Sequence, residues 1–179
     1  FNRRYSKHTK GIKRYIMNSN LPINIIATMN AGSIPSEHWV HDLNEGGGRI
    51  IGEACHMIDL CVYLTGSLVK SVCANSMGTS TELNSDNVSI MLDFKNGSNA
   101  VINYFANGAK RYAKEKLEIF YDQQTWILND FNETKYFGSK RFKRIKGLDK
   151  GHKNQFENYI NSVKNGSNCL IPIEEIVNV

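Results

Sequence analysis

The chain has 179 residues, of which 41% are hydrophobic, 10% aromatic and 22% charged, a composition that excludes a disordered or collagen-like protein. Its 22 basic and 17 acidic residues leave a net charge of +5, and no apolar run approaches the roughly 18 residues that cross a bilayer. The start of the sequence also lacks the apolar stretch of a signal peptide. We therefore expect a cytoplasmic protein with no membrane partner.

The first third of the sequence predicts a helix, a strand, a loop and a longer helix. Residues 6–18 have the hydrophobic spacing of a helix, and residues 23–30 alternate and are rich in isoleucine, as a strand is. Residues 31–45 contain a proline and two histidines, and we expect a loop there. Residues 48–64 follow glycines and end before Gly66, which predicts a buried helix.

Beyond this helix the hydrophobic pattern has a period of two, which is typical of strands. Asn96 and Gly97 indicate a tight hairpin between two such segments, and residues 152–164 predict a further helix. Because the strands run together and are flanked by helices, we expect an α+β fold, an open and mostly antiparallel sheet packed against helices, with residues 1–179 forming one domain. The strand candidates are residues 68–77, 88–94, 100–105, 117–121, 125–129, 134–137 and 141–145.

Basic side chains concentrate in two segments, residues 3–14 and residues 135–153. A pI near 9.0 makes nucleic acid a candidate partner, because phosphate neutralisation supplies most non-specific affinity. The aromatic residues lack the signature of an RNA-binding domain, and we expect no nucleic-acid partner. Solvated basic faces are the preferred explanation of the charge, and binding of an anionic small molecule is the alternative.

Five polar side chains of the predicted helix over residues 48–64 fall within an arc of about 120°, so they either pair with one another or face a cleft. One interpretation is a core histidine, His56, held between Glu53 and Asp59. The other is a general acid/base site, since histidine exchanges protons near neutral pH and a neighbouring carboxylate raises its basicity. We expect no metal, because no third ligand accompanies Glu53 and His56. The five side chains are Arg49, Glu53, His56, Asp59 and Tyr63.

The segment GGGRIIGEACHMIDLCVYLTG resembles the start of the C-terminal domain in the Gfo/Idh/MocA family, the glucose-fructose oxidoreductase and inositol dehydrogenase group. Three further segments agree with the family in the same order: FNRRYSKHTKGIK, NEGGGRIIGE with Trp39 before it, and KGHKNQFENYINSVKNGSNCLIPIEEIVNV. The resemblance implies a two-domain oxidoreductase like glyceraldehyde-3-phosphate dehydrogenase. Its N-terminal Rossmann half would bind NAD or NADP, and its C-terminal α+β half would bind substrate and form the oligomer contact.

The sequence contains neither the glycine-rich dinucleotide fingerprint nor the Glu-Lys-Pro segment of the family. The Rossmann half is therefore expected to be absent. We expect the chain to be a fragment of a longer protein, in which the NAD or NADP is held by the missing half. The fragment alone is expected to bind no cofactor and to be inactive.

The resemblance also implies roles for individual residues. His56 stands where the family has its catalytic histidine, and Glu53 follows the position, here Gly52, at which many members have an acid. We expect His56 to act as the general acid/base, and Glu53 to orient its imidazole or to bind a substrate hydroxyl. The side chains expected to bind substrate are Asn2, Arg3, Trp39, Arg49 and Asp59.

Two hypotheses for function remain. The first is the substrate domain of an NAD(P)-dependent oxidoreductase that interconverts a secondary alcohol and a ketone of a sugar, nucleotide sugar or cyclitol. The second is a catalytically silent module that binds a sugar and dimerises, which Gly52 in place of an acid favours. Both include a small sugar ligand and a homo-oligomer formed through the sheet.

Overall fold

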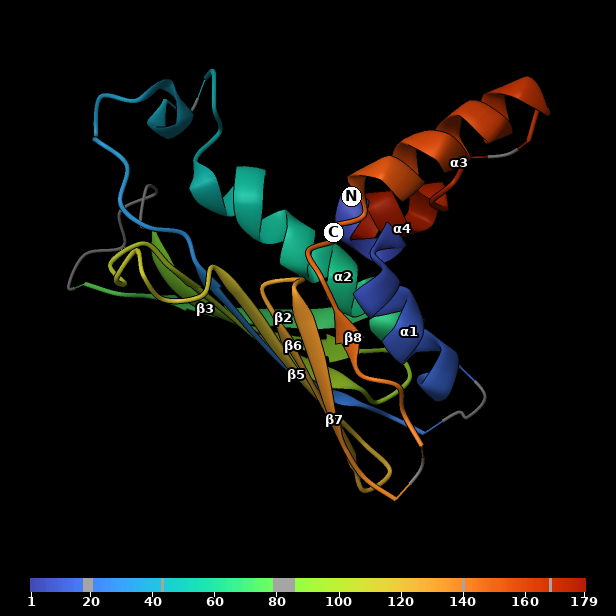
Figure 1. Cartoon of the computed structure of the whole chain (residues 1–179). Helices are drawn as coiled ribbons and strands as arrows, with labels where there is room; N and C mark the ends of the chain where they lie inside the picture. The colour runs from blue at the N-terminus through green and yellow to red at the C-terminus, as the bar shows by residue number, and fades with distance from the viewer. Residues whose placement is uncertain (18–20, 43, 79–85, 140, 168) are drawn as a thin grey trace.

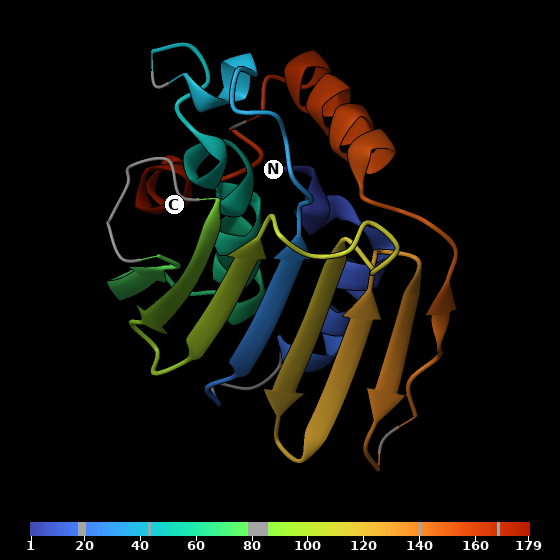
Figure 2. The same ribbon diagram turned by 90° about the vertical axis from the view of Figure 1, so that its left-hand side faces the viewer.

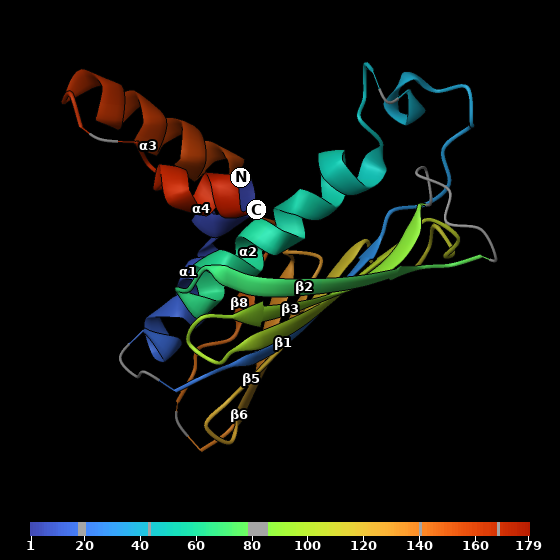
Figure 3. The same cartoon turned by 180° about the vertical axis from the view of Figure 1, so that it is seen from behind.

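The computed structural model describes residues 1–17, 21–42, 44–78, 86–139, 141–167 and 169–179. Within these residues, the strands form an open sheet in the order β2-β3-β4-β1-β5-β6-β7-β8, and the helices lie on one side of it (Figure 1 and Figure 3). The strands are β1 (Asn24–Asn30), β2 (Val69–Ser76), β3 (Asn87–Phe94), β4 (Asn99–Phe105), β5 (Glu115–Tyr121), β6 (Gln124–Asn129), β7 (Glu133–Phe137) and β8 (Ile145–Lys146). The helices are η1 (Asn2–Tyr5), α1 (Lys7–Ile16), η2 (Trp39–His41), η3 (Ile50–Ala54), α2 (Cys55–Thr65), α3 (His152–Lys164) and α4 (Ile173–Asn178).

The sheet is antiparallel except at its centre. There β1 lies parallel to β4 on one side, with Ile25 beside Ala100, and antiparallel to β5 on the other, with Ile25 beside Ile119. The hairpin between β3 and β4 turns at Gly97, whose φ of 84° is available to glycine at little steric cost. The predicted α+β fold with a mostly antiparallel open sheet is therefore confirmed.

The core lies between the sheet and the two helices α1 and α2. Ser6 caps α1 by accepting a hydrogen bond from the His8 backbone N–H at 3.1 Å, and the helix buries Ile12 against the core. Helix α2 is apolar on most sides and buries Met57 and Leu60 completely. Helix α3 projects from this layer (Figure 2), and none of its residues is buried. No helix in the described parts of the chain is long and apolar enough to cross a bilayer.

Two predicted elements differ from the structure. The single helix expected over residues 48–64 is divided into a π-helical turn, η3, and the α-helix α2. Hydrogen bonds from Arg49 to the carbonyls of Ala31 and Gly32 hold the start of the helix against the preceding loop. A π-turn accommodates one extra residue between this anchored start and the packed helix, and such turns are frequent at functional sites.

The second difference concerns the strand expected over residues 141–145. Only Ile145 and Lys146 pair with β7. The Tyr15 hydroxyl donates a hydrogen bond at 2.7 Å to the Arg141 carbonyl, which a sheet neighbour would otherwise use. The Phe142 ring packs 6.2 Å from that of the buried Trp126, so aromatic packing replaces strand pairing here.

Candidate active site

His56 lies in the first turn of α2, directly after the π-turn, and its side chain is half-buried. Its ring meets the ring of Phe1 edge-on, with centroids 5.6 Å apart and planes at 89°. Its Nδ1 atom is buried and has no hydrogen-bond partner among the described residues. Buried polar atoms without a partner are rare in folded proteins, and they are a feature of catalytic groups.

The surroundings of His56 favour the neutral imidazole. Burial lowers its pKa to about 4, and the nearby positive charges of Arg3 and the amino terminus act in the same direction. The negative charges of Glu115 and Glu53 oppose them without reversing the shift. Near neutral pH the imidazole is therefore able to accept a proton.

The two carboxylates expected beside His56 are held by arginines instead. Asp59 has no exposed surface and pairs with Arg4 at 2.6 Å. Glu53 accepts a hydrogen bond from Arg49 Nε at 3.1 Å. The interpretation of His56 as a core histidine held between two acids is therefore wrong. Because the Asp59 carboxylate is buried in an ion pair with Arg4, we assign it a structural role and do not include it in the proposed site.

Glu53 is held in place by its partner while remaining partly accessible. Arg49, with a side chain only 1% exposed, also donates to the Gly32 carbonyl at 2.7 Å and to Asp86 at 3.3 Å. The Glu53 side chain is 28% exposed. Burial and the nearby Glu53 carboxylate raise the pKa of Tyr104. A carboxylate and a phenol are thus grouped at the start of the helix.

Asn2 and Arg3 lie beside His56 in a second polar group. The Asn2 amide donates to the Lys150 carbonyl at 2.7 Å, and Arg3 forms a two-point ion pair with Glu115, at 2.6 and 3.1 Å. Burial alone would raise the pKa of Glu115, but hydrogen bonds and charges from Arg3 and Lys150 lower it overall. The sequence analysis missed Glu115, because a single acid at the start of a strand has no local pattern that sets it apart.

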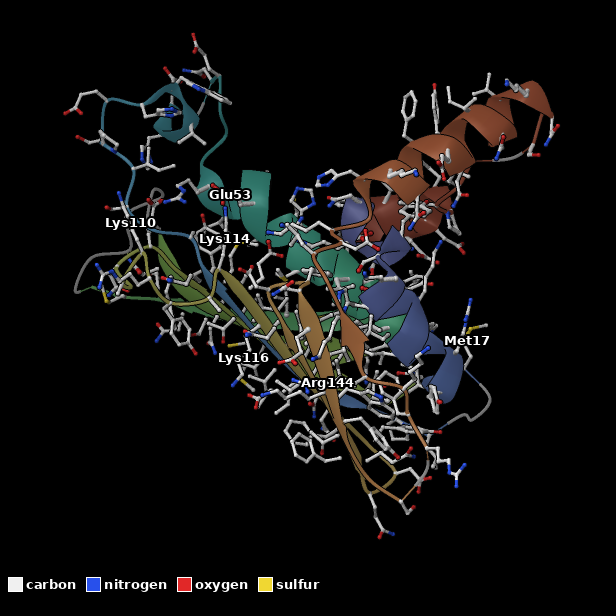
Figure 4. The ribbon with its side chains drawn as sticks, viewed as in Figure 1. Met17, Glu53, Lys110, Lys114, Lys116 and Arg144 are labelled. Atoms are coloured by element: carbon white, nitrogen blue, oxygen red, sulfur yellow. The ribbon has the colours of Figure 1, made fainter. Side chains whose placement is uncertain are left out.

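Trp39 is separated from this group. It lies in η2, on the loop that rises from the sheet beyond the start of η3 (Figure 1), and it is 59% exposed. Its ring faces that of His38, with centroids 5.7 Å apart. Figure 4 places Glu53 at the same end of the molecule as Lys110 and Lys114. The structure therefore brings Arg3 close to His56 and Asn2 against Arg3, sets Glu53 about one turn and Arg49 about two turns before His56, and leaves Trp39 exposed.

We expect the stability of the chain to decrease on acidification in part because of His56. Its pKa is about 4 in the folded chain and near 6.5 in the unfolded chain, so between these values the unfolded chain binds more protons. As the pH is lowered through this range, the free energy of unfolding decreases by less than about 1.4 kcal/mol for each pH unit, because solvent screens the open side of the ring. Urea unfolding at several pH values should give a shallower dependence for His56→Gln than for the wild-type chain.

A second buried histidine serves as the internal reference for this experiment. The ring of His8 contacts Thr134 Oγ1 at 2.8 Å and the Gly147 carbonyl at 3.0 Å, and burial lowers its pKa as well. Because His8 is present in both proteins, its contribution cancels in the comparison. Equal pH dependence in the two proteins would contradict the assignment of the shift to His56.

Comparison with known proteins agrees with this fold. Residues 22–127 match the GFO/IDH/MocA C-terminal domain, and this match covers more than half of the chain. The chain therefore belongs to the GFO/IDH/MocA family of NAD(P)-dependent oxidoreductases and corresponds to the C-terminal domain. A search of curated proteins gives no match to the sequence.

Solved structures with the same fold include two oxidoreductases and a dehydrogenase. Aldose-aldose oxidoreductase from Caulobacter crescentus, complexed with glycerol, superposes with a TM-score of 0.77 at 12% identity over 96% of this chain and 54% of that one. An oxidoreductase domain protein from Kribbella flavida gives 0.73 at 15% identity over 93% and 57%. UDP-N-acetylglucosamine 3-dehydrogenase from Acidithiobacillus ferrooxidans gives 0.64 at 17% identity over 88% and 52%. The chain thus spans little more than half the length of these structures.

The described residues do not provide a dinucleotide-binding fold of their own. β1 and β4 are the only parallel neighbours among the described strands, whereas a Rossmann fold needs a parallel sheet.

Proposed function

We propose that the chain is the substrate domain of an oxidoreductase that interconverts a secondary alcohol and a ketone of a sugar, nucleotide sugar or cyclitol. The observation that carries the proposal is the half-buried His56 ring, whose pKa is lowered by burial and by the positive charge of Arg3, so that the imidazole is neutral near pH 7. Such a ring would take the hydroxyl proton while the carbon-bound hydrogen leaves with two electrons as hydride to a nicotinamide held by the rest of the parent protein, so that the alcohol loses two hydrogens and becomes a ketone.

The neighbouring side chains have positioning roles in this proposal. Glu53, oriented by Arg49, accepts a hydrogen bond from a substrate hydroxyl through its exposed edge. Arg3, fixed by Glu115, keeps positive charge beside His56 and favours its neutral form. Asn2 lies against Arg3 and would contact the substrate beside it. The exposed Trp39 would offer an apolar surface for a sugar ring.

The test uses the parent protein with its nucleotide-binding half. NAD or NADP is added together with a panel of polyols, cyclitols and nucleotide sugars, and the absorbance of the reduced cofactor is followed. Turnover of at least one member of the panel is the expected result. Absence of turnover with every substrate, in either direction, would reject the redox proposal.

A catalytically silent sugar-binding module is the second candidate, and one observation favours it. A Cβ atom added at Gly52 would meet no other atom within 4 Å, so a side chain has room at this position but the sequence provides none. The same assay separates the two candidates. A silent module would show sugar-dependent thermal stabilisation without any change in cofactor absorbance.

We also propose that the bare face of the sheet pairs with a second copy of the chain. Helices cover one face, and the opposite face is free of them (Figure 3). Neighbouring positions across this face carry Met91, Val101 and Ile26, followed by Glu118 and Ile127. Met91 is 59% and Ile26 40% exposed, and an apolar row of this kind at the centre of a sheet is typical of a two-fold interface.

Replacing Ile26 by Lys should dissociate this dimer. Near a two-fold axis the substitution brings two ammonium groups into an apolar contact, where each must be desolvated without a partner. We expect light scattering at micromolar concentration to give about half the wild-type mass. Ile173→Lys, on the exposed surface of α4, is the matched control and should leave the mass unchanged. A wild-type chain that is monomeric under these conditions would contradict the proposal.

A further inference from the structure

The excess positive charge of the chain is distributed unevenly once its ion pairs are taken into account. Arg3 and Lys150 share the buried Glu115, and Arg4 pairs with Asp59. These basic residues are therefore engaged in ion pairs within the fold. The cations that remain available for a ligand must lie elsewhere on the surface.

Three cations without an acidic partner in the described part of the chain meet at one place. Arg14 comes from α1, Lys143 from the segment that leads into β8, and Lys146 from β8 itself. Arg144 lies among them and pairs with Glu133. The two basic segments of the sequence, far apart along the chain, thus converge between α1 and β8.

These cations surround a hollow of about 420 Å³, a volume within the range of small-molecule sites. The bottom of the hollow lies where Ile145, the first residue of β8, approaches Gly11 in α1. A Cβ atom at Gly11 would lie 2.4 Å from Ile145 Cδ1, so the glycine permits this close contact. The residues that line the hollow are Gly11, Arg14, Tyr15, Phe142, Lys143, Arg144, Ile145 and Lys146.

Aromatic rings form one wall of the hollow. Tyr15 and Phe142 pack against each other with centroids 5.1 Å apart, and both contact the buried Trp126. The hydrogen bond from the Tyr15 hydroxyl to the Arg141 carbonyl fixes this wall to the basic segment. An apolar surface made by two tilted aromatic rings therefore lies next to three cations without an acidic partner in the described part of the chain.

We propose that this hollow is a binding site for a nucleoside diphosphate. The diphosphate would be bound by Arg14, Lys143 and Lys146, and the base would stack on one of the two tilted rings, Tyr15 or Phe142. The site is separate from the proposed redox site, because Arg144 lies away from Glu53 in Figure 4 and the residues that line the hollow do not include those of the redox site. It does not depend on the proposed function.

The test measures binding of ADP to the 179-residue chain. Of the two tryptophans, Trp126 lies 6.3 Å from Tyr15 and 6.2 Å from Phe142, so its fluorescence reports on the hollow. Trp39→Phe removes the other signal. Adenosine and pyrophosphate are titrated separately, and we expect ADP to bind more tightly than either part, with an affinity that falls as salt is raised.

Variants then locate the site. We expect the double variant Lys143→Ala/Lys146→Ala to weaken ADP binding at least tenfold. The double variant Lys70→Ala/Lys153→Ala removes the same charge from exposed positions on β2 and α3 and should bind within twofold of wild type. Equal losses in the two variants, or no binding of ADP, would overturn the proposal. Tighter binding of a thymidine oligonucleotide through the same lysines would also overturn it, in favour of a polynucleotide.

Discussion

Replacing His56 by Gln should lower kcat of the full-length oxidoreductase by a factor of about 10² to 10⁴, the usual contribution of a positioned general acid or base. Glutamine retains hydrogen-bonding atoms and similar bulk but takes up no proton from the alcohol. Because the loss concerns proton transfer, we expect KM to change by less than about threefold. Steady-state rates in the direction of alcohol oxidation provide the measurement.

The pH profile separates catalysis from a structural effect. The wild-type rate of oxidation should fall as the pH approaches the pKa of His56, since burial and Arg3 make the neutral imidazole the dominant form above it. This acid limb should be absent from the residual activity of His56→Gln. His152→Gln, an identical substitution at the exposed start of α3, is the matched control. A His56→Gln enzyme with wild-type kcat and an unchanged profile would remove His56 from the mechanism.

Replacing Asp59 by Ala should lower the free energy of unfolding by about 3–5 kcal/mol, the usual effect of removing one partner from a buried ion pair. Arg4 is only 5% exposed and bonds to both oxygens of Asp59 at 2.8 Å. Without that carboxylate, Glu175, whose side chain is 26% exposed, would be the remaining acidic partner of the Arg4 guanidinium in the described structure. Urea unfolding of both proteins at neutral pH gives the difference.

A compensating variant distinguishes a lost ion pair from a general packing defect. Arg4→Met combined with Asp59→Leu replaces both charges by apolar groups of similar length, and buried ion pairs often tolerate such replacement. We expect the double variant to be more stable than Asp59→Ala alone. A double variant at least as unstable as Asp59→Ala would show that packing, and not an unpaired guanidinium, accounts for the loss.

Local patterns were sufficient to predict most of the fold. The strands alternate because one face is buried, as Ile25 and Ala27 show in β1, and the helix over residues 152–164 was predicted with the bounds of α3. The division of the long helix into η3 and α2 was missed, because it depends on contacts of Arg49 with a loop that precedes it in the sequence.

The candidate site was predicted only in part for a related reason. Spacing along one helix placed Glu53, His56 and Asp59 on the same side, and it suggested that they interact. Their actual partners come from other parts of the chain, as in the pair between Asp59 and Arg4, separated by 55 positions. Such long-range pairs have no signature in local periodicity. The position of His56 in the structure is known, whereas its role remains a prediction.

The central place of β1 has a consequence for how the chain folds. This strand is synthesised before any of its neighbours, yet it pairs with β4 and β5, whose residues follow roughly 75 to 95 positions later. The hairpin of β3 with β4 and the hairpins of β5, β6 and β7 are local and form early, because short loops close at little entropic cost. We therefore expect the insertion of β1 between the two half-sheets to be a late, non-local event that limits the folding rate.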